Sequence, residues 1–270
     1  MSKKWGLLCG DFHSGHLVGL TPPEYQHKFV QNSTTKRNKW YKISEELWVE
    51  FDKILKTLPK LDFAVFNGDL IDGKGKRSGG TESITSDMEE QANMAAKVIN
   101  RVSRCGHKDM KKIATYGTPY HTSTDGDEWE NLIVQKAEID KIGAHEWIEV
   151  NGLVIDAKHH IGSSTVPYGR HTAVAKEAIW NEMWALIDMQ PRADVVIRSH
   201  VHYFQHCGTS NKLCMTLPAL QGMGSKFGAK QCSGIVDWGV VLFEITDKNN
   251  YEWHPIIRRI KSQKTKAIKI

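Results

Sequence analysis

Short apolar runs alternate with longer stretches of helical periodicity from the N-terminus to about residue 200. An apolar run of four to eight residues between turn residues is typical of a buried strand, whereas apolar residues three and four apart predict an amphipathic helix. The expected strands are 6–9, 63–66, 113–116, 146–150, 153–158 and 195–197, and the expected helices are 44–58, 86–104, 128–142 and 173–189.

Capping and turn residues set several of these boundaries. Ser44 is expected to cap the first helix, with two glutamates in the first turn, where the helix dipole favours carboxylates. Residues 86–89 have the spacing of a capping box, which predicts the start of the second helix. The pair Asn151-Gly152 is a strong signal for a tight hairpin between two strands.

Strand-like segments without helices dominate the last third of the chain, at 203–207, 213–217, 239–245 and 251–257. Early strand–helix alternation followed by antiparallel strands predicts two sheets packed face to face with helices outside. The 270 residues contain neither an internal repeat nor a linker. We therefore expect a single domain over 1–270, with a core at about 5–257 and a basic tail at 258–270.

Composition and charge exclude several classes of protein. The net charge of +5 permits a polyanionic substrate without requiring one. The five cysteines are scattered without a CxxC pair, so neither a zinc ribbon nor a disulfide framework is expected. No signal-peptide core opens the chain, and no run approaches the roughly 18 apolar residues of a membrane span. We expect a cytoplasmic protein without membrane association; its oligomeric state is left open.

Aspartate or histidine follows each of several expected strands. If the segment after the first strand is extended, Asp11 and His13 point to the same side of it. They then lie beyond the carboxyl end of the strand, where open α/β sheets bind ligands. A carboxylate and an imidazole together suit a divalent metal. A turn carboxylate or a surface histidine is the alternative at each position alone, but the recurrence along the chain favours one shared site.

The order of these residues resembles the motifs of the calcineurin-like metallophosphoesterases, which are DxH, GDxxD, GNH[DE], a lone His and GHxH. The corresponding segments are Asp11-Phe-His13, Gly68-Asp69-Leu-Ile-Asp72, Gly117-Thr-Pro-Tyr-His121, His159-His160 and Ser199-His200-Val-His202. The resemblance covers about residues 5–205 and looks most like phage and prophage members. It implies an α/β fold, a four-layer αββα sandwich of two mixed sheets flanked by helices, with two divalent metal ions at the strand ends.

The resemblance also implies roles for individual residues. Asp11, His13 and His202 would hold the first metal. His159 and His200 would hold the second, and Asp69 would bridge the two. His160 remains an alternative to His159.

The third motif departs from the family pattern. Thr118 stands where the family has a metal-binding Asn, and His121 comes two residues late. The Thr118 hydroxyl can replace the amide oxygen, or His121 can fill that position. His121 is otherwise the only nearby candidate for the general acid, and we expect Thr118 and Arg170 to contact the substrate.

Oxygen and imidazole ligands without a nearby cysteine suit Mn best, with Fe or Zn as alternatives. Two metals about 3.5–4 Å apart screen the charge of a phosphate ester and lower the pKa of a shared water. A basic chain, a basic loop at 74–77 and loop aromatics that can stack bases favour a phosphodiester, such as a nucleic acid or nucleotide. These aromatics are Trp40, Tyr41, Tyr120, Tyr168 and Tyr203. These aromatics can equally belong to the core or rim. The alternatives are a phosphomonoesterase acting on a protein or small molecule, and a binding protein with a degenerate site.

Overall fold

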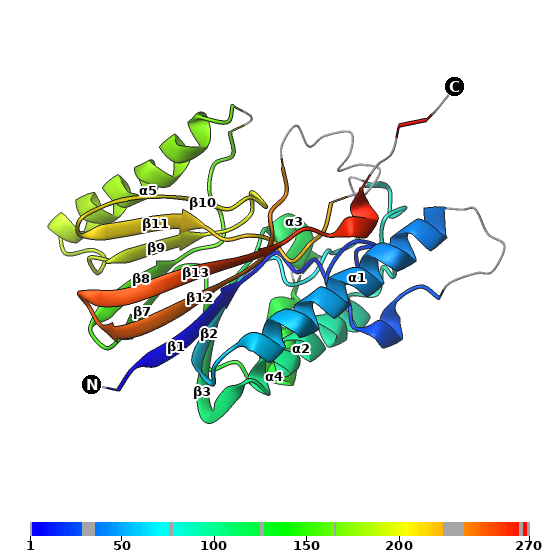
Figure 1. The fold of residues 1–270 in the computed structure, drawn as a ribbon, viewed down its shortest axis with the longest axis horizontal. Coiled ribbons are helices and arrows are strands. Elements are labelled where there is room, and N and C mark those ends of the chain that lie inside the picture. The colour runs from blue at the N-terminus through cyan, green and yellow to red at the C-terminus, as the bar shows by residue number, and fades with distance from the viewer. Residues whose placement is uncertain are drawn as a thin grey trace.

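The computed structural model describes residues 2–28, 36–75, 78–124, 127–164, 166–223, 235–264 and 267–268. Its centre is a pair of mixed sheets (Figure 1). In spatial order, the first contains β13 (Asn250–Arg258), β12 (Trp238–Asp247), β1 (Lys4–Cys9), β2 (Leu61–Asn67), β3 (Gly106–Thr115) and β6 (Lys141–Gly143). The second contains β10 (Gln205–Thr209), β11 (Lys212–Thr216), β9 (Val195–Arg198), β8 (Leu153–Ala157) and β7 (Glu146–Val150).

Helices cover the outer faces of both sheets (Figure 1). The helices are α1 (Lys36–Thr57), α2 (Met88–Ser103), α3 (Pro119–Thr122), α4 (Glu130–Ala137) and α5 (Gly169–Leu186), with short 3-10 turns η1 (Pro23–Tyr25) and η3 (Lys261–Gln263) and a small ribbon of β4 (Ser123–Thr124) and β5 (Asp127–Glu128). The first sheet packs on α1, α2 and α4, and the second packs on α5. The expected four-layer α/β sandwich is confirmed.

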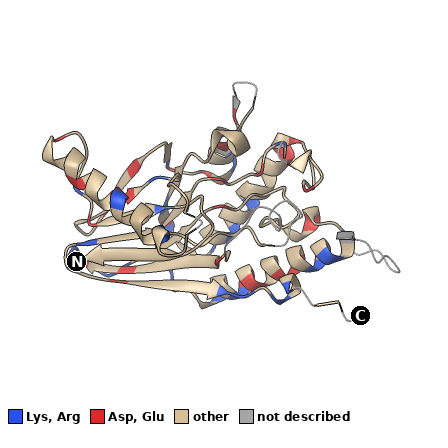
Figure 2. Cartoon of the chain, turned by 90° about the horizontal axis from the view of Figure 1, so that it is seen from above, with Lys and Arg blue, Asp and Glu red and all other residues tan. Residues whose placement is uncertain are grey.

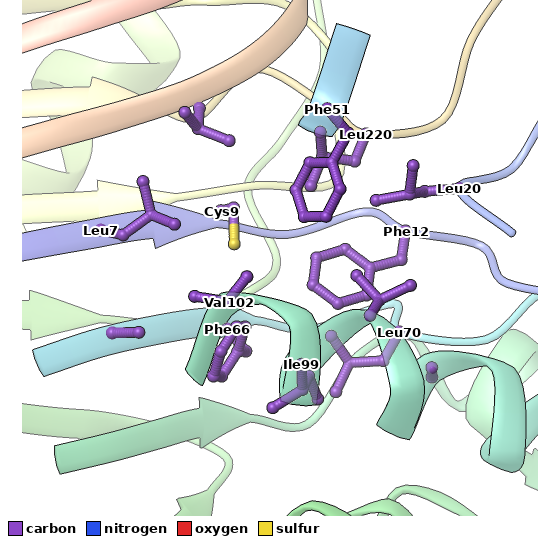
Figure 3. Packing of buried hydrophobic residues seen from close by; sticks show 14 of the residues in the cluster. Leu7, Cys9, Phe12, Leu20, Phe51, Phe66, Leu70, Ile99, Val102 and Leu220 are labelled. Carbon is purple, nitrogen blue, oxygen red and sulfur yellow. The ribbon is translucent and has the colours of Figure 1, made fainter. Parts of the chain in front are cut away.

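Strand alternation divides the core between the layers. Leu7 of β1 faces the helices, whereas Leu8 faces the second sheet, because successive side chains of a strand point to opposite faces. Figure 3 shows the layer between the first sheet and the helices, where Phe12, Phe51 and Phe66 lie among aliphatic side chains. This packing fixes the carboxyl ends of β1 and β2 at the centre of the molecule.

The boundaries of all four expected helices differ from those of the structure. The helix expected over 173–189 begins and ends earlier, since α5 spans Gly169–Leu186. α1 begins at Lys36, so Ser44 lies inside it, and its hydroxyl donates to the carbonyl of Leu17 (2.7 Å) instead of capping the helix. α2 is capped by Asp87, which accepts from the backbone of its first turn. The helix expected over 128–142 is wrong beyond α4, because Glu138 adopts a left-handed conformation (φ 51°) that ends the helix and leads into β6.

The hairpin at Asn151-Gly152 is confirmed, and both residues have positive φ, as a tight primed turn requires. β13 ends at Arg258, where the basic tail was expected to begin, and Lys266 and Lys269 of that tail lie outside the described residues. The start of the tail docks on α1 through Glu46, which accepts from two backbone N–H groups of η3. In the described part of the chain, no helix combines the length and apolarity needed to cross a bilayer.

Candidate metal centre

The six expected metal ligands converge where strands of both sheets end. Ligand-type atoms of Asp11, His13 and His202 lie within 4.8 Å of one another, and those of Asp69, His159 and His200 form a second such group. The two groups adjoin, since His13 Nε2 is 4.0 Å from Asp11 Oδ1 and 3.9 Å from Asp69 Oδ2. These groups coincide with the ligand sets that the resemblance implied for the first and second metals.

The backbone of these ligands is unusual. Eight described non-glycine residues have positive φ, and five of them are expected ligands: Asp11 (49°), His13 (44°), Asp69 (51°), His200 (73°) and His202 (55°). A left-handed conformation costs a side-chain-bearing residue about 1–2 kcal/mol. Such strain persists only where the surroundings over-determine it, and it clusters at functional sites.

The segment after β1 shows how this conformation is held. The N–H groups of Asp11 and His13 donate to the carbonyls of Gly68 and Asp69, at 2.9 and 3.0 Å. The expectation of an extended segment is therefore wrong, because the chain curls along the loop that follows β2. Phe12 points into the core, with its ring edge-on to Phe66 at 6.1 Å (Figure 3).

Two glycines make room for the ligands. Gly68 has a φ of +75°, and a Cβ there would lie 2.5 Å from Nδ1 of His159. A Cβ at Gly117 would collide with the backbone nitrogen and carboxylate of Asp69. Neither position can carry a side chain without moving a ligand.

Hydrogen bonds from Nδ1 orient the rings of the two most buried expected histidine ligands. His13 Nδ1 donates to Asp72 Oδ1 at 3.2 Å, and His159 Nδ1 donates to the carbonyl of Asn67 at 2.7 Å. The Nε2 atoms of both rings are buried without a hydrogen-bond partner, although that of His159 is only 3.0 Å from Asp69 Oδ2. A buried unpaired nitrogen costs about 1–3 kcal/mol. Metal-bound histidines share this arrangement, with the distal N–H on a carboxylate or carbonyl, so the donor set fits cations.

The electrostatics also favour cations. Burial alone would raise the pKa of Asp69, yet the nearby imidazoles, chiefly His159, hold it well below its usual range. Asp11 follows the same pattern, since His202 and His159 lower its pKa against burial. Burial lowers the pKa of His13 to about 4, whereas Asp69 overcomes burial and raises the pKa of His159 to about 10. Both carboxylates therefore stay ionised at neutral pH.

Thr118 lies at the second ligand group. Its backbone N–H donates to Asp69 Oδ1 at 2.6 Å, and its hydroxyl is 3.2 Å from both Asp69 Oδ2 and His200 Nδ1. The hydroxyl thus occupies the side of the site where the resemblance implied an amide oxygen. Its role as ligand or substrate contact stays a prediction.

His121 lies beside the first ligand group. Its ring meets that of His13 edge-on at 4.6 Å, and it forms a third cluster of ligand-type atoms with His13 and Asp69. His121 Nδ1 donates to the carbonyl of Asp72 at 2.8 Å. The short helix α3, which starts with Pro119, returns the imidazole to the site despite the longer motif.

His160 and Arg170 lie at the periphery. His160 is exposed and its ring approaches that of His200 at 4.7 Å, whereas His159 groups with Asp69 and His200, so the geometry favours His159. Arg170, expected in a loop, lies in the first turn of α5 with its guanidinium 4.2 Å from the centre of the Tyr203 ring. Its contact with substrate stays a prediction.

Sequence reasoning missed the residues that hold the ligand loops. Buried Asn67 joins the strand ends: its amide donates to Ser199 Oγ (2.7 Å) and the Lys158 carbonyl (3.2 Å), and its oxygen accepts from Thr115 Oγ1 (2.9 Å). Its place directly before Gly68-Asp69 was the one signal available for it.

Glu130 is the second such residue. It is fully buried on α4, where its carboxylate accepts from the N–H of Gly117 (2.8 Å) and more weakly from that of Leu70 (3.4 Å). Burial raises the pKa of Glu130 to about 7. Because Gly117 and Leu70 flank Asp69, this carboxylate positions the loops on either side of the expected bridging ligand.

Comparisons with known proteins give similarity of fold. No family model matches the sequence, and no curated protein matches it. The chain is similar to Vps29 complexed with zinc from Entamoeba histolytica, at 14% identity and a TM-score of 0.42, covering 94% of this chain and 98% of that one. A novel archaeal phosphodiesterase is 12% identical with a TM-score of 0.43, covering 93% and 99%. The phosphoesterase Yfce from E. coli is 11% identical with a TM-score of 0.41, covering 93% and 98%. At these identities and TM-scores, no residue role is transferred from them.

Proposed function

We propose that this chain is a dimetal phosphoesterase of the calcineurin-like type. The observation that carries the proposal is the pair of adjoining ligand groups: the buried Nε2 of His13 has no hydrogen-bond partner, and the buried Nε2 of His159 has only the ionised carboxylate of Asp69 at 3.0 Å. An apoprotein with these groups holds buried imidazole nitrogens without hydrogen-bond partners in two adjoining ligand sets. A pair of divalent cations satisfies both sets, and Mn is favoured, with Fe or Zn as alternatives.

The residues divide between the two cations as the geometry groups them. Asp11, His13 and His202 would hold one, His159 and His200 would hold the other, and Asp69 lies between them. When bound, such a pair supplies positive charge to a phosphate ester and lowers the pKa of water toward neutrality.

His121 is proposed as the proton donor to the leaving group. Its Nδ1 is engaged by the Asp72 carbonyl, which leaves Nε2 as the nitrogen that can deliver a proton. The side chain is 20% exposed, more than the 4% of its neighbour His13, so it lies at the mouth of the site where a leaving alkoxide would emerge.

The proposed substrate class is a phosphodiester of the kind that a nucleic acid or a nucleotide contains. Support comes from Tyr120, whose ring packs edge-on against His121 at 4.9 Å, next to the proposed acid. Two other aromatics expected to stack bases do not support it, because Tyr203 is buried and Trp40 packs against the core. Stacking on an aromatic beside the leaving group favours a base-bearing substrate.

Charge adds little to this choice. Figure 2 shows basic and acidic residues interspersed along the described chain, including α1. Lys76 and Arg77 of the expected basic loop lie outside the described residues. A phosphomonoesterase acting on a protein or small molecule is therefore the second candidate, and binding without catalysis, motivated by the altered third motif, is the third.

One experiment separates these candidates. Metal content and hydrolysis of a nitrophenyl phosphodiester and a nitrophenyl phosphomonoester are measured for the wild type and for Asp69→Asn. Asp109→Asn, on the exposed part of β3, is the matched control. We expect two metals and faster diester hydrolysis in the wild type and control, and loss of both in Asp69→Asn. Faster monoester hydrolysis would favour the second candidate, and metal without turnover would favour the third. The likeness to phage members and a cytoplasmic location remain predictions.

A further inference from the structure

One face of α5 is apolar and exposed. Seven large apolar side chains in its C-terminal half and the turn that follows are between 41% and 71% exposed: Ile179, Trp180, Met183, Trp184, Leu186, Ile187 and Met189. Positions three and four apart on a helix lie on the same face. Ile179, Met183 and Ile187 therefore form one stripe with the tryptophans beside it, and we call these seven residues the α5 face.

The opposite side of α5 is attached to the second sheet by polar contacts. Buried Asn181 donates to Asp156 Oδ2 (3.2 Å) and accepts from Lys212 Nζ (2.7 Å). Glu177 accepts from the guanidinium of Arg198 at 2.6 Å. Most surface helices turn their apolar stripe toward the core. Here hydrogen bonds and ion pairs, together with the small apolar side chains Val174 and Ala178, hold the helix with its large apolar stripe facing outward.

No described element covers this face. α5 lies alone on the outside of the second sheet, and the other long helices pack on the far side of the first (Figure 1). If a large side chain has a full surface of about 200 Å², the exposed fractions of the seven residues together amount to roughly 800 Å². The largest apolar patch on a typical monomer is about 300–600 Å². A standard stable interface buries about 800 Å² on each partner, so the α5 face matches the area that a dimer needs.

We propose that the α5 face pairs with the same face of a second copy of this chain, with the two helices antiparallel about a two-fold axis at Met183. This arrangement places Ile179 of each copy against Ile187 of the other. It is isologous, so one surface satisfies both partners.

Charge agrees with the antiparallel direction. Exposed Lys176 precedes the stripe and exposed Asp188 follows it, and neither forms an ion pair within the described part of the chain. Antiparallel pairing brings the lysine of each copy toward the aspartate of the other and opposes the two helix dipoles. A parallel pair would place like charges together. The proposal is independent of the proposed function, because α5 supplies none of the expected metal ligands.

The first test measures oligomeric state by sedimentation and light scattering from low to high micromolar concentration. We expect the wild type to be a dimer and Met183→Glu to be a monomer, with the dissociation constant raised at least roughly 100-fold, because two like charges meet at the axis. Val49→Glu, at an apolar position on α1 that is 44% exposed against 50% for Met183, is the matched control and should remain dimeric. Circular dichroism checks that each variant is folded.

The second test locates the axis. Met183→Cys should form a disulfide-linked dimer on mild oxidation, whereas Val49→Cys should behave like the wild type on a non-reducing gel. A wild type that stays monomeric across the concentration range overturns the proposal and leaves a different protein as the occupant of the face. A dimer that survives Met183→Glu, or a Met183→Cys protein that does not cross-link, also overturns it, because another surface then makes the dimer.

Discussion

Replacing Glu130 by Gln should change how the stability of the apoprotein depends on pH. Glu130 is fully buried, and burial raises its pKa from an ordinary 4.5 to about 7. Below pH 4.5 the carboxyl is protonated in both the folded and the unfolded chain. Between pH 4.5 and about 7 the unfolded chain releases this proton while the folded chain retains it, so a rise in pH favours unfolding.

The magnitude follows from the shift in pKa. Each unit is worth about 1.4 kcal/mol, so Glu130 lowers the free energy of unfolding by about 3 kcal/mol between pH 4.5 and pH 8. Gln does not titrate and escapes this loss. Its single oxygen can accept from Gly117 but leaves its amide facing the N–H of Leu70, which costs about 1–3 kcal/mol at every pH. The variant should therefore be less stable than the wild type near pH 5 and at least as stable near pH 8.

The assay is denaturant unfolding of both proteins at several pH values in the presence of a chelator, which keeps cation charge out of the site. The quantity of interest is the difference between the two free energies of unfolding. Glu149→Gln, at an exposed carboxylate of β7, is the matched control for the loss of a carboxylate. A difference that stays flat with pH for Glu130→Gln would show that this carboxylate is ionised throughout, and the reasoning from burial would be refuted.

Three further predictions concern the site. His121→Ala should slow hydrolysis of an unactivated diester by roughly 10²–10⁴-fold while largely sparing that of a nitrophenyl ester, whose leaving group departs without a proton. Equal loss of activity on both substrates together with loss of metal would instead make His121 a ligand. Gly68→Ala should lower metal content and destabilise the fold, because the new Cβ meets the His159 ring. Gly79 also has a positive φ (+62°) but has open space around it, so Gly79→Ala should retain metal. Equal metal content in both variants would contradict the steric argument. Chelation should inactivate the enzyme reversibly, with Mn restoring more activity than Mg, since Mg prefers oxygen ligands and the site offers four imidazoles; equal rescue would count against a histidine-rich centre.

The convergence of the ligands could be predicted from sequence because it depends on local order. Asp11, Asp69 and His159 each follow an apolar run, and the carboxyl ends of such strands meet near one place in a layered α/β fold. The residue types then indicated a metal site before any geometry was known. The same reasoning identified both sheets and most of the helices.

The local backbone at these ligands could not be predicted in the same way. Positive φ at Asp11 and His13 arises from hydrogen bonds to the loop after β2, more than 50 residues away in the chain. The premature end of α4 at Glu138 is likewise invisible to an apolar periodicity that continues past it. In each case a tertiary or single-residue backbone effect overrode the local pattern.

The residues that sequence reasoning missed share a physical role, which explains why they were missed. Asn67 and Glu130 bond backbone or hydroxyl groups that belong to other strands and loops, so their own neighbourhoods do not show which groups they hold. Five of the expected ligands have a strained, left-handed backbone conformation. Hydrophobic packing is non-directional, so the apolar core alone cannot orient the peptide planes of these residues. Hydrogen bonds are directional and supply that orientation. The motif residues therefore determine which atoms the site contains, and these buried polar side chains determine where those atoms point.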